Sequence, residues 1–110
     1  MARESTGAVP RAHSRKAARN GKKLRNRELA VLLNALSHPA RITILQVLLQ
    51  RDYIFGQLAQ QLPLAQSTIS QHLAILKSAG LVVSMPVGKQ SCCCVVRKKV
   101  ERLKGLVAAL

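Results

Sequence analysis

The sequence has few aromatic and few acidic residues. Its 110 residues contain no Trp, one Phe and one Tyr, and only 4 Asp or Glu stand against 18 Lys or Arg. So few carboxylates leave little for acid–base catalysis, and the sequence shows no Ser/His/Asp set, pair of carboxylates or phosphate-binding loop. These absences predict a protein that is not an enzyme and that has a core of aliphatic side chains.

Long apolar runs are absent as well. The sequence contains neither a stretch of about 18 apolar residues nor the apolar centre of a signal peptide, so we expect no membrane span and no secretion. The formal net charge of +14 favours nucleic acid as the partner. We therefore expect a cytoplasmic protein on the nucleoid, without structural disulfides.

Two short helical patterns, separated by a corner that contains proline, lie within residues 55 to 81. In the first pattern Leu58, Ala59 and Leu62 recur at helical spacing, and Ala59 is small enough to let another helix cross closely. Pro63 lacks a backbone N–H and disfavours the α conformation at Leu62, so the first helix should end there. This arrangement is typical of a helix-turn-helix.

The second pattern predicts a recognition helix from Gln66 to Ala79. Ile69, Leu73 and Leu76 form its apolar row, and Gly80 is placed to end it in a left-handed conformation. The other face carries Gln66, Ser67, Thr68, Ser70, Gln71 and Lys77. Amide and hydroxyl groups both donate and accept hydrogen bonds, as the base edges of the major groove require. The alternative is a polar face that is only solvated. The turn at Pro63 and the β-prone segment after the helix favour a face that contacts DNA bases.

A β-hairpin is predicted directly after this helix. Residues 81–84 and 91–96 are β-prone, and residues 85–90 contain the Pro and Gly of a loop. A helix-turn-helix followed by a hairpin is a winged helix, a mainly α fold with a small β-hairpin (α+β).

The segments LSHPARITIL, QSTISQHLAILKSAGLV and VGK resemble the ArsR/SmtB family of small bacterial dimeric repressors. The resemblance covers about residues 33–96. It implies a homodimer that binds an inverted repeat in double-stranded DNA, with base-reading residues at 66, 67, 68, 70 and 71 and a wing-tip cation at Lys89. In that family a metal, metalloid or redox signal usually releases the DNA.

The sequence departs from the family at both usual effector sites. Tyr53-Ile54-Phe55 stands where arsenic and cadmium sensors carry a cysteine pair. The last helix carries a cationic set where zinc and nickel sensors carry Asp and His: Lys98, Lys99, Glu101, Arg102 and Lys104. We therefore expect no cofactor and no metal at those sites, and the effector is unknown. Ala65 also replaces the Ser or Thr that often caps the recognition helix.

Three further helical segments have recognisable patterns. Residues 27–36 and 100–110 are apolar enough to suggest the dimer interface, with Leu29, Leu32 and Leu33 packing across a two-fold axis on Leu103, Leu106, Val107 and Leu110. Residues 39–50 begin with Pro39 and predict a central helix whose core residues are Ile42, Leu45, Val47, Leu48 and Leu49. His38 should lie at the entry of that helix near solvent, and His72 should be a packing or hydrogen-bonding group.

Residues 1–26 predict a basic, disordered arm ahead of a winged domain at residues 27–110. Up to Arg27 the chain has nine Lys or Arg and one Glu. Such an arm would bind phosphates through Arg15, Lys16, Arg19, Lys22, Lys23 and Arg25, adding salt-dependent affinity with little sequence preference. An organelle-targeting leader is the alternative that we consider weaker.

Cys92-Cys93-Cys94 is the one cluster that suggests chemistry beyond binding. On a strand Cys92 and Cys94 share one face, about 6.6 Å apart along the chain, and Cys93 points to the other. Cys92 and Cys94 are candidate thiol sensors of a soft metal or of redox state, with no third ligand evident. The interpretation that we favour is that all three are small apolar fillers.

Together these patterns predict a sequence-specific DNA-binding transcriptional regulator, a repressor of the ArsR type. The alternative is a winged-helix module that binds proteins, or nucleic acid without sequence preference. The ratio of specific to non-specific affinity at rising salt separates the two.

Overall fold

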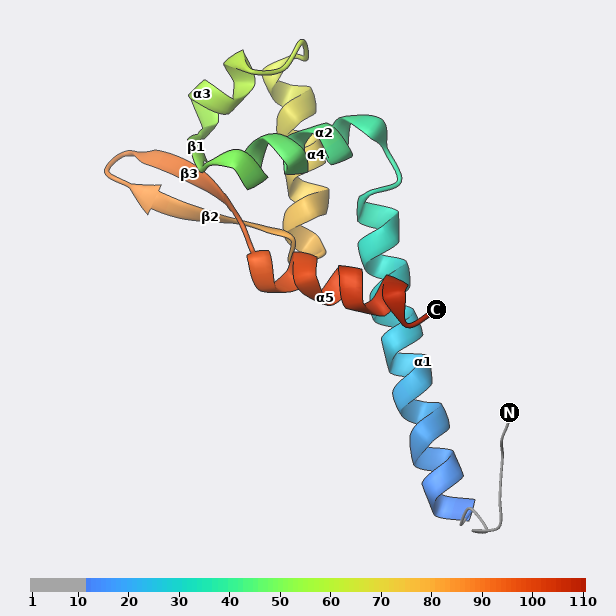
Figure 1. The fold of residues 1–110 in the computed structure, drawn as a ribbon. Helices are drawn as coiled ribbons and strands as arrows, with labels where there is room; N and C mark the ends of the chain where they lie inside the picture. Colours follow the sequence, from blue (N-terminus) through green and yellow to red (C-terminus); the bar gives the residue numbers. More distant parts are fainter. Residues whose placement is uncertain (1–11) are drawn as a thin grey trace.

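The computed structural model describes the backbone of residues 12–110 and the side chains from residue 19 onward (Figure 1). Its elements in chain order are α1 (Ala12–Ala35), α2 (Pro39–Gln50), β1 (Tyr53–Ile54), α3 (Phe55–Gln60), α4 (Gln66–Ser78), β2 (Val82–Val87), β3 (Gln90–Val95) and α5 (Arg97–Ala108). The mainly α winged-helix fold predicted from the sequence is confirmed.

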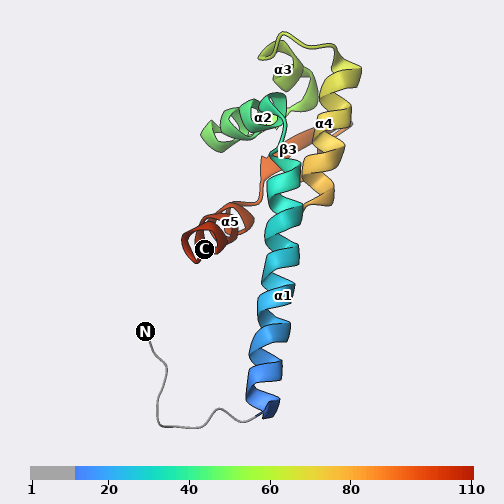
Figure 2. The ribbon, with the colours of Figure 1, turned by 90° about the vertical axis from the view of Figure 1, so that its right-hand side faces the viewer.

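The basic segment from Ala12 to residue 26 is helical, which corrects the prediction of a disordered arm. Ala, Lys and Arg all have high helix propensity, and the segment extends a helix that its apolar end already nucleates. α1 therefore runs through the predicted boundary at residue 26 without a break and projects from the rest of the fold (Figures 1 and 2). Residues 1–11 lie outside the described part.

The projecting helix makes the molecule elongated. Its principal extents are 61 × 27 × 21 Å, and its radius of gyration is 18.9 Å. A compact domain of about 100 residues has a radius of gyration of roughly 13 Å. Much of α1 thus lies beyond the core of its own chain.

α2 begins and ends where the sequence predicts. His38 is exposed, and its Nδ1 accepts a hydrogen bond of 3.1 Å from the N–H of Ala40, so it caps the helix ahead of Pro39. The buried face consists of Ile44, Leu45 and Leu48, and Val47 and Leu49 are partly buried. The prediction for Ile42 was wrong, since Ile42 is 41% exposed. It lies on the face of the helix opposite to Ile44.

α4 is the recognition helix of the sequence prediction, one residue shorter. Ile69, Leu73 and Leu76 are all buried in the core. The helix ends at Gly80, which has φ 80°, with the N–H of Leu81 bonded to the oxygen of Leu76 and that of Gly80 to the oxygen of Lys77. This double closure needs the left-handed conformation that glycine adopts without strain.

The wing is part of a three-stranded antiparallel sheet of order β1-β3-β2. The predicted loop of residues 85–90 was too long, because β2 and β3 pair as far as Val87 and Gln90 and leave only Gly88 and Lys89 in the turn. Gly88 has φ 62°, which suits a two-residue hairpin. β1 was missed because two residues are too short to show an alternating pattern.

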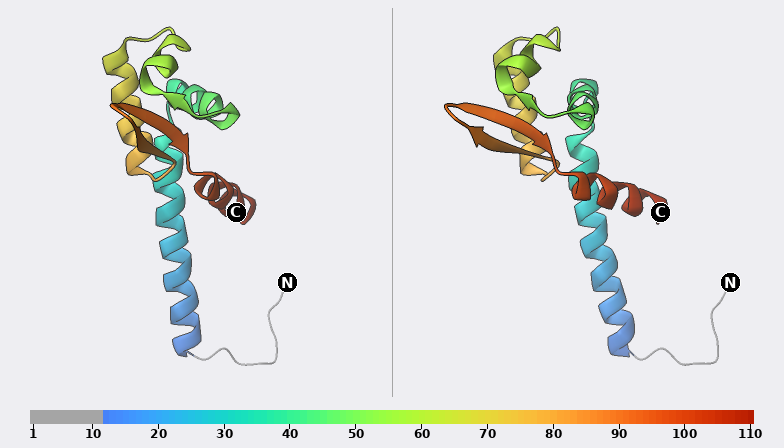
Figure 3. Two further views of the ribbon diagram at one scale, coloured as in Figure 1. Left: turned by 90° about the vertical axis from the view of Figure 1, so that its left-hand side faces the viewer. Right: turned by 60° about the vertical axis from the view of Figure 1, so that its left-hand side comes forward.

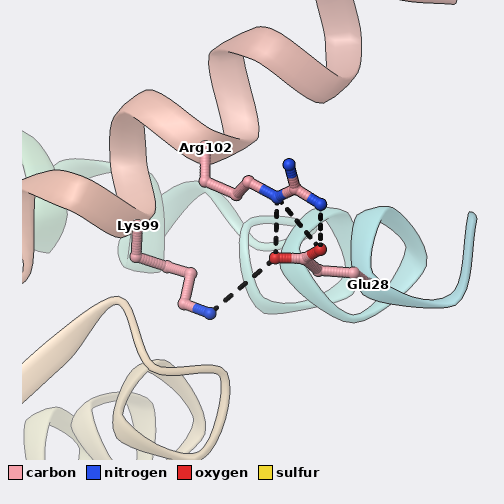
Figure 4. Close-up of polar contacts among 3 residues, drawn as sticks. All are labelled: Glu28, Lys99 and Arg102. Carbon is pink, nitrogen blue, oxygen red and sulfur yellow. Dashed lines mark hydrogen bonds and ion pairs between the residues drawn. The ribbon is translucent and has the colours of Figure 1, made fainter. Parts of the chain in front are cut away.

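α5 packs on α1 within the same chain (Figure 2). Leu29, Leu32, Leu103 and Leu106 are at most 8% exposed, so they belong to the core of one chain and were wrongly assigned to a dimer interface. Figure 4 shows the ion pairs beside this contact. The Glu28 carboxylate of α1 accepts hydrogen bonds from Nε and Nη2 of Arg102, and it lies 3.8 Å from the Lys99 ammonium.

Among the described residues no single helix is both long enough and apolar enough to cross a membrane. Only the bent pair made of residues 19–35 and α2, with an angle of 94° between its parts, meets a test of length and composition.

Candidate nucleic-acid interface

The polar face of α4 points away from the core, as the sequence predicts. Gln66, Ser67, Ser70 and Gln71 are exposed, and Thr68 is half-buried. Lys77 is exposed in the last turn of the same helix. Since Ile69, Leu73 and Leu76 are buried in the core on the opposite face, packing determines which face of α4 is presented to solvent.

The N-terminus of α4 has no side-chain cap. Ala65 has the extended backbone of an N-cap residue (φ −65°, ψ 148°), and the first helical hydrogen bond runs from the N–H of Ile69 to its oxygen. The N–H groups of the first turn therefore have no partner within the helix. Together with the helix dipole, they make this end suited to an anion such as a phosphate.

The wing places an exposed cation at the hairpin turn. Lys89 follows Gly88 there, and the hairpin extends sideways from the body that contains α3 and α4 (Figure 3). The structure thus gives Lys89 the tip position that the family resemblance implies.

An open cavity of about 620 Å³ lies between α3, the start of α4 and the start of β3. It is lined by Ile54, Phe55, Gly56, Gln57, Gln60, Gln66, Gln90 and Ser91. The sequence analysis identified only Gln66 among these as a candidate. Gln57 and Gln60 lie on α3, Gln66 begins α4 and Gln90 begins β3, so no local pattern could have indicated that these three elements meet at one cavity.

A second feature that the sequence analysis missed fixes the position of α4. The Arg41 Nε of α2 donates a 2.7 Å hydrogen bond to the oxygen of Ala35, and its Nη1 lies 3.2 Å from Nδ1 of His72. The rings of His72 and His38 are 4.6 Å apart between centroids. His72 is therefore a hydrogen-bonding group of the recognition helix, as predicted, and it ties α4 to the end of α1.

Comparison with known proteins agrees with this geometry. Residues 38–84 match the family described as "Bacterial regulatory protein, arsR family". The crystal structure of the transcriptional repressor BigR from Xylella fastidiosa is 30% identical, with a TM-score of 0.65 over 84% of this chain and 95% of that one. The chain belongs to the ArsR family.

Two other relatives support the assignment to the ArsR family. An ArsR-like transcriptional regulator from Rhodococcus sp. RHA1 is 30% identical, with a TM-score of 0.71 over 76% of this chain and 79% of that one. The biofilm growth-associated repressor of Agrobacterium fabrum is 40% identical over 63 residues, which are 57% of this chain and 54% of that protein. The chain thus matches about half the length of such curated relatives. ArsR-family proteins are regulators, in agreement with the prediction that the chain is not an enzyme.

The basic residues of α1 are not beside the recognition helix of this ArsR-family chain. Arg19, Lys22, Lys23 and Arg25 are exposed on the half of α1 that points away from α4 and the wing (Figure 1). Arg15 and Lys16 lie in the same helix, but their side chains are outside the described part. Any joint action of these cations with α4 therefore requires DNA or a second chain to span the distance.

The three cysteines divide between the two faces of β3, as the alternation predicts. Cys93 is 1% exposed and packs in the core, whereas Cys92 and Cys94 are half-buried on the other face. The interpretation as apolar filler therefore holds for Cys93. For Cys92 and Cys94, whose Sγ atoms are 3.7 Å apart, it stays a prediction.

Proposed function

We propose that this ArsR-family chain is a transcriptional repressor that binds an inverted-repeat DNA operator as a homodimer. The observation that carries the proposal is the exposed face of α4, where Gln66, Ser67, Ser70 and Gln71 project from a helix held by a buried row. Their amide and hydroxyl groups complement the donors and acceptors of base edges, and Gln pairs bidentately with adenine. α4 lies in the major groove and reads the sequence.

Backbone contacts position this helix on the duplex. The uncapped N-terminus of α4 faces one phosphate, and Lys89 at the wing tip contacts the backbone beside the groove. The glutamines of the adjoining cavity, Gln57, Gln60 and Gln90, add neutral donors to the same strand. These contacts set the register of the complex without reading sequence.

Dimerisation covers apolar side chains that one chain leaves exposed. Leu33 is 46% exposed on α1, and Val107 and Leu110 at the C-terminal end are 44% and 88% exposed. Leu24, on the projecting half of α1, is 65% exposed. A helix that extends alone into water is marginally stable, so a second copy packed along α1 and α5 stabilises it. In such a dimer the recognition helices lie about 34–36 Å apart, one turn of DNA.

The cationic residues of α1 supply affinity rather than specificity. Each Lys or Arg that contacts a phosphate releases counterions, so this part of the binding weakens steeply as salt rises. A regulator of this kind acts on the nucleoid in the cytoplasm.

The test is a selection of bound duplexes from a genomic library, followed by affinity measurements on the best duplex and on a scrambled duplex of the same composition. Both are measured at low and at physiological salt. A repressor keeps a large ratio between the two affinities as salt rises. If both affinities fall together and no consensus emerges, the chain is a non-specific nucleic-acid-binding module, and the proposal is wrong.

A further inference from the structure

The outer face of the sheet brings together three groups that the sequence keeps apart. The side chains of Asp52, Cys92 and Cys94 place one carboxylate oxygen and two sulfur atoms all within 4.8 Å of one another. Asp52 is exposed and the two cysteines are half-buried, so the group is open to solvent on one side.

The register of the strands explains why these three residues meet. β1 pairs with β3 through Tyr53 opposite Cys93 and Ile54 opposite Cys92. Continuing this antiparallel ladder by one residue places Asp52 beside Cys94. Opposed residues share a face and neighbours alternate, so Asp52, Cys92 and Cys94 lie on the face opposite to buried Cys93.

The distances suit a tetrahedral ion with sulfur ligands. A Zn²⁺–sulfur bond of about 2.3 Å in tetrahedral geometry separates two sulfur ligands by about 3.8 Å. The Sγ atoms of Cys92 and Cys94 are 3.7 Å apart, so both can bind one ion without moving. With a Zn²⁺–oxygen bond of about 2.0 Å, the same geometry requires a distance of about 3.5 Å between the Asp52 carboxylate oxygen and each sulfur. Rotation of the exposed Asp52 side chain provides this approach.

We infer that Asp52, Cys92 and Cys94 form a binding site for a thiophilic divalent cation of the Zn²⁺ or Cd²⁺ type. Two thiolates and one carboxylate carry three negative charges toward a dication, and they leave a fourth position for water or an added ligand. Each thiol releases its proton when the ion binds.

The ion would connect two parts of the DNA-binding surface. Asp52 directly precedes β1, which runs into α3, whereas both cysteines lie on the wing strand. Ile54, opposite Cys92, also lines the cavity between α3, α4 and β3. An ion held by all three side chains therefore fixes the start of β1 and α3 relative to the wing strand and changes operator affinity. This regulatory part rests on the proposed function; the site itself does not.

The site is tested by titrating the reduced full-length chain with Cd²⁺ and recording thiolate-to-cadmium charge-transfer absorbance. We expect saturation at one ion per chain and loss of the band when Zn²⁺ competes. Cys92→Ser and Cys94→Ser should each abolish most of the band, and Asp52→Asn should weaken binding by on the order of tenfold or more. Circular dichroism checks that each variant is folded.

Two controls make the result specific. Cys93→Ala removes a thiol from the opposite face and should keep the band; Glu101→Gln removes an exposed carboxylate from α5 and should keep the affinity. A band that survives in both serine variants, or one that requires Cys93, overturns the site. If the site binds Cd²⁺ but operator affinity does not change, only the regulatory link is wrong. If the protein has no operator, the absorbance titration still shows whether Cd²⁺ binds at Asp52, Cys92 and Cys94.

Discussion

The Arg41 guanidinium on α2 faces the His72 imidazole on the recognition helix, with 3.2 Å between Nη1 and Nδ1. Arg41 also donates to the oxygens of Ala35 and Asn34 at the end of α1. Because an arginine nitrogen can only donate, Nδ1 of His72 accepts and the imidazole is neutral. Partial burial, followed by the charges of His38 and Arg41, lowers the pKa of His72 below its usual 6.5.

This arrangement predicts a loss of stability in weakly acidic solution. The unfolded chain binds a proton at His72 near pH 6.5, whereas the folded chain binds it only at lower pH. The contribution of neutral His72 is therefore complete above pH 6.5 and is lost as pH falls toward the folded pKa. Urea unfolding as a function of pH should show this decline in the parent and a flatter profile in His72→Gln. Parallel profiles would show that His72 does not cause the decline.

Replacement of Gln71 by Ala should reduce sequence preference. Gln71 is exposed on the face of α4 opposite to the buried row, so its loss removes a base contact without disturbing the core. Affinity for the best selected duplex should fall by about 1–3 kcal/mol, with much less change on scrambled DNA. Gln46→Ala, at an exposed position of α2, is the matched control and should change neither affinity. Equal reductions on both duplexes would contradict base reading.

Leu33→Glu should prevent dimer formation. Leu33 is 46% exposed on α1, and a carboxylate there cannot be buried against a second copy without a large desolvation cost. Light scattering at micromolar concentration should report a dimer for the parent and a monomer for the variant. Ile42→Glu provides the control, since Ile42 is 41% exposed on α2, outside the proposed interface. A parent that is monomeric in this experiment rules out the homodimer.

Neutralising the cations of α1 should weaken the salt dependence of DNA binding. The triple change Lys22→Gln, Lys23→Gln and Arg25→Gln keeps good helix formers in an exposed part of α1. The slope of log affinity against log salt should become shallower by about 0.9 for each phosphate that the variant no longer neutralises, and the ranking of DNA sequences should be retained. Lys98→Gln with Lys104→Gln on α5 serves for comparison. An unchanged slope in the triple variant would show that these cations do not touch DNA.

The sequence predicted best where the controlling interactions are local. Pro39 marks the start of α2, and Gly80 with its positive φ marks the end of α4. Between Gln66 and Gly80 the apolar residues recur at helical spacing, which determines both the buried row and the polar face opposite to it. The family resemblance rests on the same local segment.

The sequence pattern of the basic segment is compatible with two structures. A run of Lys and Arg without apolar periodicity is typical of disorder, yet these residues are also good helix formers. The segment is helical from Ala12 onward because it continues the apolar half of α1. Composition alone does not predict whether the basic segment is helical or disordered, because the outcome depends on what the neighbouring segment packs against.

The sequence alone predicts a winged-helix regulator with a polar recognition helix, since local backbone preferences and apolar spacing specify its helices and its hairpin. Only the tertiary structure placed Asp52 beside Cys92 and Cys94, and Arg41 beside His72. Both groups join residues that are distant in the sequence, 31 positions apart for Arg41 and His72. Their contacts depend on strand register and helix packing, which the whole core sets by burying side chains such as Leu48, Leu58 and Cys93.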